Sequence, residues 1–305
     1  MSAGLPEAGS AAGTTEGVDE AFADIDGWPV ARILSGLLDH QAQAIAAVRA
    51  AAPALEAAVA AAVPRLEAGG RLIYVGAGTS GRLGTQDGAE LTPTFSWPRE
   101  RCVFLMAGGD GALTRSVEGA ADDAAAGAAR MTAAAPGPAD VVIAVAASGT
   151  TPFVLAAAAA ARRAGALAIA IACNPGAPLL AACEIPVLLA TGAEAISGST
   201  RLKAGTAQKV ALNLLSTALM VRLGRVYRGQ MVEMQATNVK LRRRALRMLA
   251  RIGGRDEDAA RAALDASGGD LKVAILVLLD AVSPDAARQR LAATGGRVRA
   301  ARGGA

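Results

Sequence analysis

The sequence predicts an α/β fold built on a parallel sheet with helices on both faces. Short apolar runs of strand length recur through the middle of the chain, and segments with helical spacing of apolar residues lie between them. This alternation is typical of β–α–β units, which place parallel strands in one sheet through right-handed crossovers. The predicted strands cover residues 71–75, 102–106, 141–146, 166–172 and 185–190.

Apolar residues at helical spacing predict the helices around these strands. An alanine-rich helical region is divided near Pro53, because proline interrupts a helix. No strand is expected after residue 200, and Asp270 and Ser283 are plausible N-caps. The expected helical segments are 30–66, 111–130, 152–164, 202–223, 231–252, 256–266, 270–280 and 284–293.

The chain is expected to divide into three parts. Residues 1–20 read as a disordered tail because they are rich in Ala, Gly and Ser. Residues 21–252 form the sheet domain with its flanking helices, and residues 253–305 form a small helical appendage.

Composition narrows the class of ligand and the cellular compartment. Lys and Arg number 31 against 27 Asp and Glu, and this net charge of +4 fits an anionic small molecule better than nucleic acid. No signal peptide and no uninterrupted run of eighteen apolar residues is visible, so no membrane is expected. The three cysteines lack metal-ligand spacing, and His40 is the only histidine. These features predict a cytoplasmic protein without a metal.

Glycine and hydroxyl residues follow the first and third predicted strands. The loops are Gly-Ala-Gly-Thr-Ser-Gly-Arg at 76–82 and Ala-Ser-Gly-Thr-Thr-Pro at 147–152. Loops after parallel strands meet at the carboxyl edge of the sheet, where glycines and helix amino termini bind oxyanions. A third segment, 197–206, opens the long helix. The residues predicted to bind a phosphorylated ligand are Gly78, Thr79, Ser80, Ser148, Gly149, Thr151, Ser199 and Lys203.

The two loops are also compatible with a dinucleotide site and with simple helix capping. The first loop matches G-x-G-x-x-G, so a dinucleotide fold is a rival, with Asp110 as its acidic residue. Serine and threonine are ordinary helix N-caps as well. Two hydroxyl-rich loops on one edge suit a monophosphate and a sugar better than a dinucleotide.

The same segments resemble the N-acetylmuramic acid 6-phosphate etherases. The most specific match is Ser-Thr-Arg-Leu-Lys-Ala-Gly-Thr-Ala-Gln-Lys at 199–209, and the resemblance extends over nearly the whole chain. The core also resembles the sugar isomerase (SIS) domain of phosphosugar isomerases and glucokinase regulatory proteins. The resemblance implies a SIS-type fold, a homodimer with active sites near its interface, and no cofactor. The other matching segments are 76–84, 93–95, 107–109, 117–120 and 147–149.

The resemblance implies cleavage of the D-lactyl ether by elimination and then hydration. A base removes the proton at C2, an acid protonates the lactate oxygen that leaves C3, and water adds to the double bond. The reaction needs two groups in opposite protonation states. Glu90 falls at the acid glutamate of the family, and Leu91 and Pro93 are expected to desolvate it and raise its pKa.

The chain departs from the family at its second glutamate, where Ala121 stands. Glu118, three residues earlier on the expected helix, and Asp122 are candidate substitutes. Glu194 is a further carboxylate near a strand end. A non-catalytic sugar-phosphate sensor and an aldose–ketose isomerase with Glu194 or Glu118 as its base therefore remain alternatives.

The spacing between Ser80 and Glu90 poses a geometric problem. Ten residues of continuous helix span about 15 Å, which is longer than a hexose. Either the helix breaks, at Gly84 or Gly88, or Glu90 serves a site completed by another subunit.

Overall fold

The computed structural model describes residues 14–234 and 239–303. Contacts divide the described chain into two units. The sheet unit comprises the residues up to Gly88 together with Glu100–Leu215, and the C-terminal unit comprises Ala89–Arg99 together with the residues from Ser216 onward. The expected boundary after residue 252 stays a prediction.

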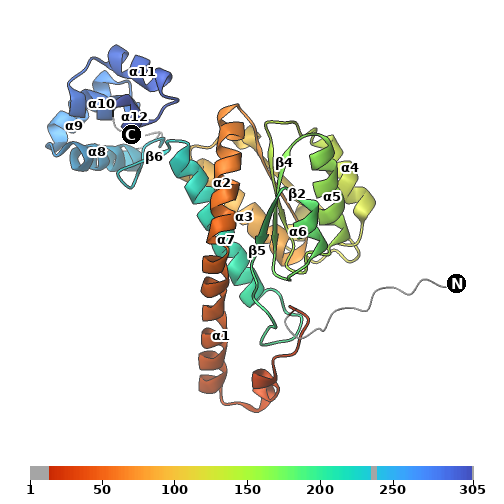
Figure 1. Ribbon diagram of the computed structural model, residues 1–305. Helices are drawn as coiled ribbons and strands as arrows, with labels where there is room; N and C mark the ends of the chain where they lie inside the picture. Colours follow the sequence, from red (N-terminus) through yellow and green to blue (C-terminus); the bar gives the residue numbers. More distant parts are fainter. Residues whose placement is uncertain (1–13, 235–238, 304–305) are drawn as a thin grey trace. The chain divides into compact units, whose positions relative to one another are not determined.

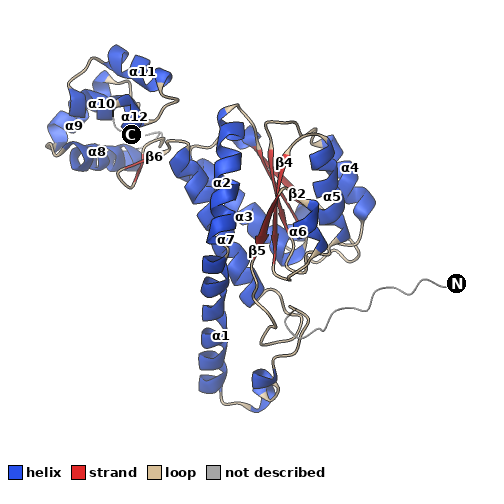
Figure 2. Cartoon of the chain, in the orientation of Figure 1, coloured by secondary structure: helices blue, strands red, loops and turns tan. Residues whose placement is uncertain are grey.

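The elements follow the chain in a largely alternating order (Figures 1 and 2). The strands are β1 (Leu72–Gly76), β2 (Cys102–Met106), β3 (Val141–Val145), β4 (Leu167–Ala172), β5 (Ile185–Leu188), β6 (Val226–Tyr227) and β7 (Gln230–Met231). The α-helices are α1 (Val30–Ala50), α2 (Ala52–Glu67), α3 (Gly78–Phe95), α4 (Ala124–Ala133), α5 (Pro152–Arg163), α6 (Pro178–Ala182), α7 (Lys203–Arg222), α8 (Val239–Gly253), α9 (Glu257–Ala266), α10 (Leu271–Asp280), α11 (Pro284–Ala293) and α12 (Val298–Ala301). Short 3-10 helices are η1 (Glu20–Phe22), η2 (Ile25–Gly27), η3 (Arg99–Arg101) and η4 (Asp110–Leu113).

Five parallel strands form the sheet, in the order β2-β1-β3-β4-β5. All five lie where the apolar runs predict them, and the α/β class is confirmed. Strands β1, β3 and β4 are buried along their whole length, as expected for a sheet covered on both faces. Helices α4, α5 and α6 lie on one face and α2 lies on the other (Figure 1).

Small residues let α4 and α5 approach each other closely. Ala157, Ala158 and Ala161 of α5 are fully buried, and a Cβ atom added to Gly127 of α4 would lie 2.2 Å from the carbonyl oxygen of Phe153. Larger side chains at these positions would push the helices apart, because a packed interior has no free volume for them.

Helices α1 and α2 meet at Ala51, and Pro53 lies in the first turn of α2. The predicted division near Pro53 is confirmed, because proline fits a first turn but not a helix interior. Among the described residues, no single helix has both the length and the hydropathy to span a membrane. Helices α1 and α2 meet that test only as a pair, with a bend of 52° between them.

The amino-terminal segment contacts the sheet unit. Of the tail expected over residues 1–20, residues 1–13 lie outside the described residues, whereas residues 14–20 are folded. Thr15 is fully buried, and Val18 forms a parallel bridge with Glu194. Residues 14–20 are therefore part of the sheet unit.

The helix expected over 111–130 is wrong for residues 114–123. Turns occupy this stretch between η4 and α4, and Gly119 has a φ of 71°, which lies outside the helical region. The Asp123 side chain accepts a 2.8 Å hydrogen bond from the Ala126 amide and caps α4 at its true start. Glu118 and Asp122 thus lie in turns, and the expectation that Glu118 lies on a helix, on nearly the same face as Ala121, is wrong.

The C-terminal unit holds a short hairpin that the sequence did not predict. Strands β6 and β7 pair antiparallel across Arg228 and Gly229, which both have positive φ as a type I′ turn requires. The helix expected from residue 231 is therefore wrong at residues 231–234, and residues 235–238 lie outside the described residues. The Asp270 and Ser283 caps are confirmed, because each accepts a hydrogen bond from the backbone amide three residues later.

Candidate active site

The two glycine-rich loops leave the same edge of the sheet. Strand β1 ends at Gly76 and its neighbour β3 ends at Val145, and these two residues are paired across the parallel ladder. The segments that follow both strands therefore begin side by side at the carboxyl edge. The expectation that the loops of Ser80 and Ser148 share one edge is confirmed.

The first loop turns so tightly that it leaves no room for side chains at two positions. A Cβ atom on Gly81 would lie 2.7 Å from the carbonyl carbon of Gly76, and one on Gly76 would lie 2.5 Å from the Cα of Gly81. Ser80 is buried, and its hydroxyl donates a 2.9 Å hydrogen bond to Oε1 of Gln208 on α7. Thr79 is half-buried and Gly78 is exposed at the start of α3. The loop is thus anchored through Ser80 and open at Gly78.

In the second loop, hydroxyl groups form hydrogen bonds within the loop itself. The Ser148 hydroxyl oxygen accepts hydrogen bonds from the backbone amide (3.2 Å) and the hydroxyl (3.0 Å) of Thr150. Gly149 has a φ of 69°, and a Cβ atom there would lie 2.4 Å from the Cβ of Ala177. Thr151 occupies the N-cap position of α5, but its side chain makes no capping hydrogen bond. Capping therefore does not account for the Thr151 hydroxyl.

Glu194 caps α7 with both oxygens of its carboxylate. It is fully buried and accepts hydrogen bonds from the backbone amides of Lys203 (2.9 Å) and Ala204 (2.8 Å). A negative charge at a helix amino terminus is favourable because the helix dipole is positive there. Both oxygens of Glu194 are occupied by these hydrogen bonds, so the isomerase alternative loses one of its two candidate bases.

Lys203 lies within the sheet unit rather than at its surface. Its side chain is buried, and its ammonium donates a 3.0 Å hydrogen bond to Oε1 of Gln43 on α1. Burial lowers the pKa of Lys203, and the charges of Glu194 and Asp19 oppose that shift. Ser199 is half-buried in the segment before α7.

Sequence reasoning missed three polar residues that organise this edge. Gln208 holds Ser80, and Asn174, which follows β4, links the amino-terminal segment to the second loop. The Asn174 side-chain oxygen accepts from the Thr15 amide (2.9 Å), and its nitrogen donates to the Thr15 hydroxyl (3.2 Å) and the Ser148 carbonyl (3.4 Å). The sequence offered two signals, because Asn174 lies two residues after β4 and Gln208 stands in the 199–209 segment that resembles the etherases.

Two of the three cysteines, Cys173 and Cys183, are buried, and Cys102 is half-buried. Burial raises the pKa of each of the three thiols, of Cys102, Cys173 and Cys183, to about 12. A thiol with such a pKa is protonated at neutral pH and is a poor nucleophile.

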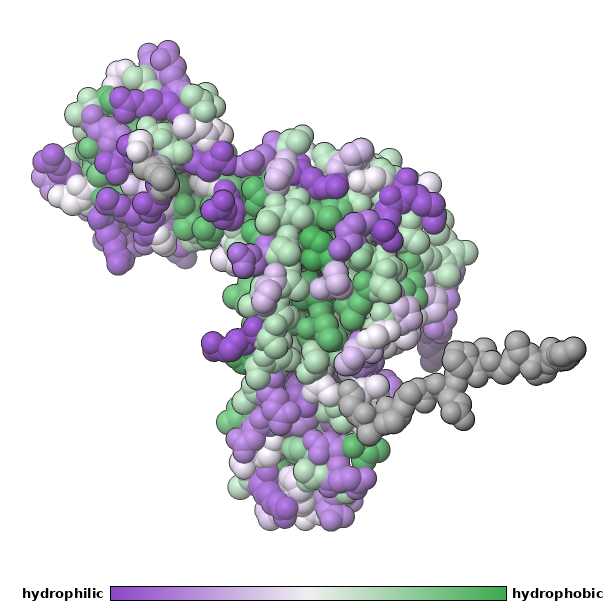
Figure 3. Space-filling view, in the orientation of Figure 1, coloured by the Kyte–Doolittle hydropathy of each residue, from purple (hydrophilic) through white to green (hydrophobic). Residues whose placement is uncertain are grey.

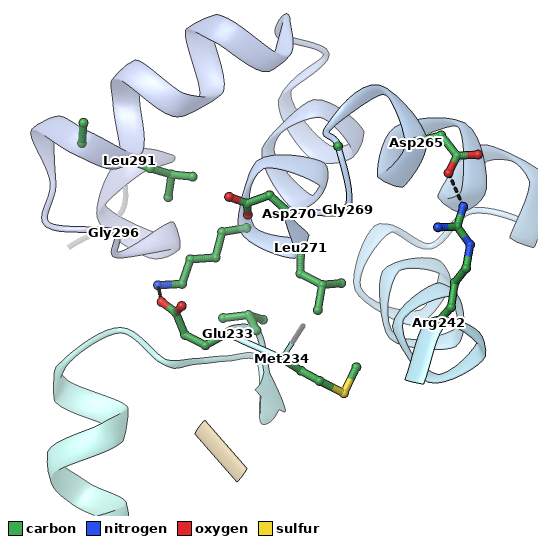
Figure 4. A pocket seen from close by; sticks show the side chains of 13 residues that line it. Glu233, Met234, Arg242, Asp265, Gly269, Asp270, Leu271, Leu291 and Gly296 are labelled. Carbon is green, nitrogen blue, oxygen red and sulfur yellow. Dashed lines mark hydrogen bonds and ion pairs between the residues drawn. The ribbon is translucent and has the colours of Figure 1, made fainter. Parts of the chain in front are cut away.

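A cavity of about 840 Å³ lies entirely in the C-terminal unit (Figure 4). Its charged side chains pair with one another, Lys272 with Glu233 and Arg242 with Asp265. Its lining includes none of the loop residues described above. Cavity size therefore does not mark the candidate active site.

The comparisons with known proteins agree with this geometry. A profile of the glucokinase regulatory protein N-terminal SIS domain matches residues 54–162, and a SIS domain profile matches residues 120–218. The chain is 57% identical to an N-acetylmuramic acid 6-phosphate etherase of Deinococcus radiodurans, over 93% of each chain. The chain belongs to the N-acetylmuramic acid 6-phosphate etherase family. A second member, the etherase of Cutibacterium acnes, is 46% identical over 94% of this chain and 95% of its own length.

Solved structures also include similar folds. A phosphoheptose isomerase from Francisella tularensis is 17% identical, with a TM-score of 0.48, and covers 64% of this chain and 100% of its own.

Ala121, the position at which the family resemblance leads us to expect a second glutamate, contacts the first turn of α5 after the second loop. The carbonyl oxygen of Ala121 accepts a 3.0 Å hydrogen bond from the amide of Phe153, in the first turn of α5. The neighbouring Glu118 and Asp122 are both exposed. The turn therefore brings the Ala121 backbone to the first turn of α5, and Glu118 and Asp122 flank this contact in the chain.

Helix α3 carries Glu90, the residue expected to act as the acid, without a break. It is continuous from Gly78 to Phe95, so the expected break at Gly84 or Gly88 is wrong. A Cβ atom on Gly88 would lie 2.5 Å from the Phe104 ring and 2.7 Å from the Tyr74 ring, so this glycine permits close packing on the sheet. Glu90 is exposed, whereas the neighbouring Leu91 is buried, so the Leu91 side chain does not cover the carboxylate as expected.

Proposed function

We propose that this chain cleaves the D-lactyl ether of N-acetylmuramic acid 6-phosphate to give N-acetylglucosamine 6-phosphate and D-lactate. The proposal is supported by family membership over nearly the whole chain. The structural observation that carries it is the shared carboxyl edge of β1 and β3, from which both hydroxyl-rich loops leave. Since the relatives carry the name of an enzyme, a non-catalytic sensor is not favoured.

The site is assigned to residues of the two loops and of the segment before α7. The first turns of α3 and α5 direct backbone amides toward this edge, where a phosphate dianion is favoured. The residues proposed to bind the phosphate and the sugar are Gly78, Thr79, Ser80, Ser148, Gly149, Thr151, Ser199 and Lys203.

Glu90 is proposed as the acid that protonates the departing lactate oxygen, and Glu118 and Asp122 are candidates for the base. Along the continuous α3, Glu90 follows Ser80 by ten residues, about 15 Å of helix. A hexose does not span that distance, so Glu90 is assigned to a site completed by a second copy of the chain. The active form is thus a homodimer.

Exposed apolar surface on the sheet unit supports this association. Leu34 and Leu38 of α1 are 64% and 71% exposed, and Ile45 is 47% exposed. Figure 3 shows further apolar surface over α2 and the edge strand β5. Such surface is favourably buried against another chain. The described cysteines are free thiols, which fits the proposed location in the cytoplasm.

Incubation of the pure protein with N-acetylmuramic acid 6-phosphate, followed by an assay for D-lactate, tests the function. The wild type is expected to release lactate, and Glu90→Gln is expected to lower the rate by about 100-fold or more because an amide cannot donate the proton. A wild type that releases no lactate above the Glu90→Gln control, or one that forms a ketose instead, overturns the proposal.

A further inference from the structure

The amino-terminal segment brings a carboxylate to the carboxyl edge of the sheet. Glu16 is exposed, and its Oε2 atom would lie 3.1 Å from a Cβ atom added to Gly198. Gly198 stands in the segment before α7, between Ser197 and Ser199. The carboxylate of Glu16 is therefore held beside one of the three segments assigned to substrate binding.

The segment is fixed by contacts that leave this carboxylate unused. Thr15 is fully buried and is held by two hydrogen bonds with the side chain of Asn174. The Ser197 hydroxyl donates a 3.1 Å hydrogen bond to the main-chain carbonyl of Glu16, and Val18 pairs with Glu194. The backbone on both sides of Glu16 is thus anchored, while its side chain contributes to none of these contacts.

The same anchors connect Glu16 to the second loop. Asn174 also donates to the Ser148 carbonyl, so Thr15 and Ser148 share one side chain as a partner. Glu16 follows Thr15 directly. A sugar phosphate bound between the Ser148 loop and the segment before α7 meets the Glu16 carboxylate at the same edge.

We propose that Glu16 is the base that removes the C2 proton of the substrate, in place of the carboxylate that is absent at Ala121. This inference rests on the proposed function. The Glu16 carboxylate takes the C2 proton, the C–H electron pair forms the C2–C3 double bond, and the C3–O bond breaks as Glu90 gives its proton to lactate. Water then adds its hydroxide to C3 and its proton to Glu90, and Glu16 returns its proton to C2.

Glu16→Gln tests this role, with Glu20→Gln as the matched control, because Glu20 is an exposed carboxylate of the same amino-terminal segment and has no part in the proposed site. Glu118→Gln and Asp122→Asn test the two rival bases. Two measurements are made: release of D-lactate, and exchange of the C2 hydrogen of N-acetylglucosamine 6-phosphate with deuterium from D₂O. Exchange reports proton transfer at C2 separately from cleavage of the ether. Glu16→Gln is expected to lower both rates by about 100-fold or more, whereas Glu20→Gln stays close to the wild type. The thermal midpoint of Glu16→Gln stays unchanged, because Ser197 binds the main-chain carbonyl of Glu16 and not its carboxylate.

The outcomes separate this inference from the proposed function. An active wild type with an equally active Glu16→Gln variant overturns the role of Glu16, and loss of exchange in Glu118→Gln or Asp122→Asn moves the base to that residue. A wild type without lactate release overturns the function instead. If Glu16→Gln also lowers the thermal midpoint, the double variant Glu16→Gln/Ala121→Glu tells loss of the base from loss of folding. Recovery of C2 hydrogen exchange in the double variant shows that Glu16→Gln lacked only a carboxylate, and no recovery counts against the proposal.

Discussion

The two edges of the central sheet use polar residues in opposite ways. At the amino edge, the residues just before the strands pair with one another or with carbonyl groups. Arg71 binds Asp140 at 2.7 Å and the carbonyls of Ala134 and Ala135, and Arg101 donates to the Gly70 carbonyl at 2.9 Å. At the carboxyl edge, tight glycine turns present backbone amides and hydroxyl groups instead. The difference teaches that paired charges fasten the amino edge, while the two loops at the carboxyl edge, where we propose that the ligand binds, keep backbone amides and hydroxyl groups.

The largest effect is expected at the carboxyl edge, from Gly149→Ala. The new methyl group clashes with Ala177 at a position of positive φ, and this should cost about 3 kcal/mol of folding free energy and displace the Ser148 loop. Lactate release should be lost, as measured by the D-lactate assay beside a urea unfolding curve.

Gly176→Ala is the matched control for this substitution. Gly176 also has positive φ, at 72°, but no atom lies within 4 Å of its added Cβ. Backbone strain alone should cost about 1 kcal/mol. Equal losses of stability in the two variants would contradict the view that close packing with Ala177 sets the shape of the second loop.

A smaller effect on stability, without an effect on catalysis, is expected at the amino edge from Asp140→Asn. Burial acts to raise the pKa of Asp140, but hydrogen bonds from Arg71 and from the Gly137 amide outweigh it and hold that pKa below its ordinary value. The carboxylate therefore stabilises the fold above the unfolded-state pKa of about 3.9, and this contribution is lost as the pH falls through the lower folded-state pKa.

Unfolding by urea at several pH values measures this contribution. Asp140→Asn should lower the free energy of unfolding by about 2 kcal/mol at pH 7, and the difference from the wild type should close below about pH 4. The turnover number should not change, since Asp140 lies before β3 and the site lies after it. A lower turnover number for Asp140→Asn, measured where this variant is fully folded, would show that the two edges are not separate in function.

The smallest effect on stability is expected from Thr151→Ala. The Thr151 side chain makes no capping hydrogen bond to α5, so its loss should change the free energy of unfolding by less than about 0.5 kcal/mol. The KM for the substrate should rise by about tenfold or less, as expected for the loss of one hydrogen bond. A large loss of stability with an unchanged KM would identify Thr151 as a structural residue.

The predictable parts of the fold were those fixed by local chemistry. The five strands were found because each is a short apolar run between helical segments, and the Asp270 and Ser283 caps act within four residues of themselves. The turn at 114–123 and the hairpin at Val226–Met231 were missed. The alanine and charged residues of 114–123 also fit a helix, and the positive φ of Gly119 overrode that propensity. The hairpin was missed because its strands are only two residues long and its turn depends on positive φ at Arg228 and Gly229.

The sequence by itself determined the class of fold and the shared edge of the two loops, because strand patterns and the direction of parallel strands suffice for these two features. The resemblance of the sequence to the etherases singled out Glu90 and Ala121. Only the tertiary structure decided what each polar side chain does. Ser80 is bound to Gln208, Glu194 is bound to the start of α7, and Glu16 is carried to the edge by Thr15 and Asn174. These contacts join residues far apart in the chain, or depend on the exact path of a turn, and no local pattern encodes them.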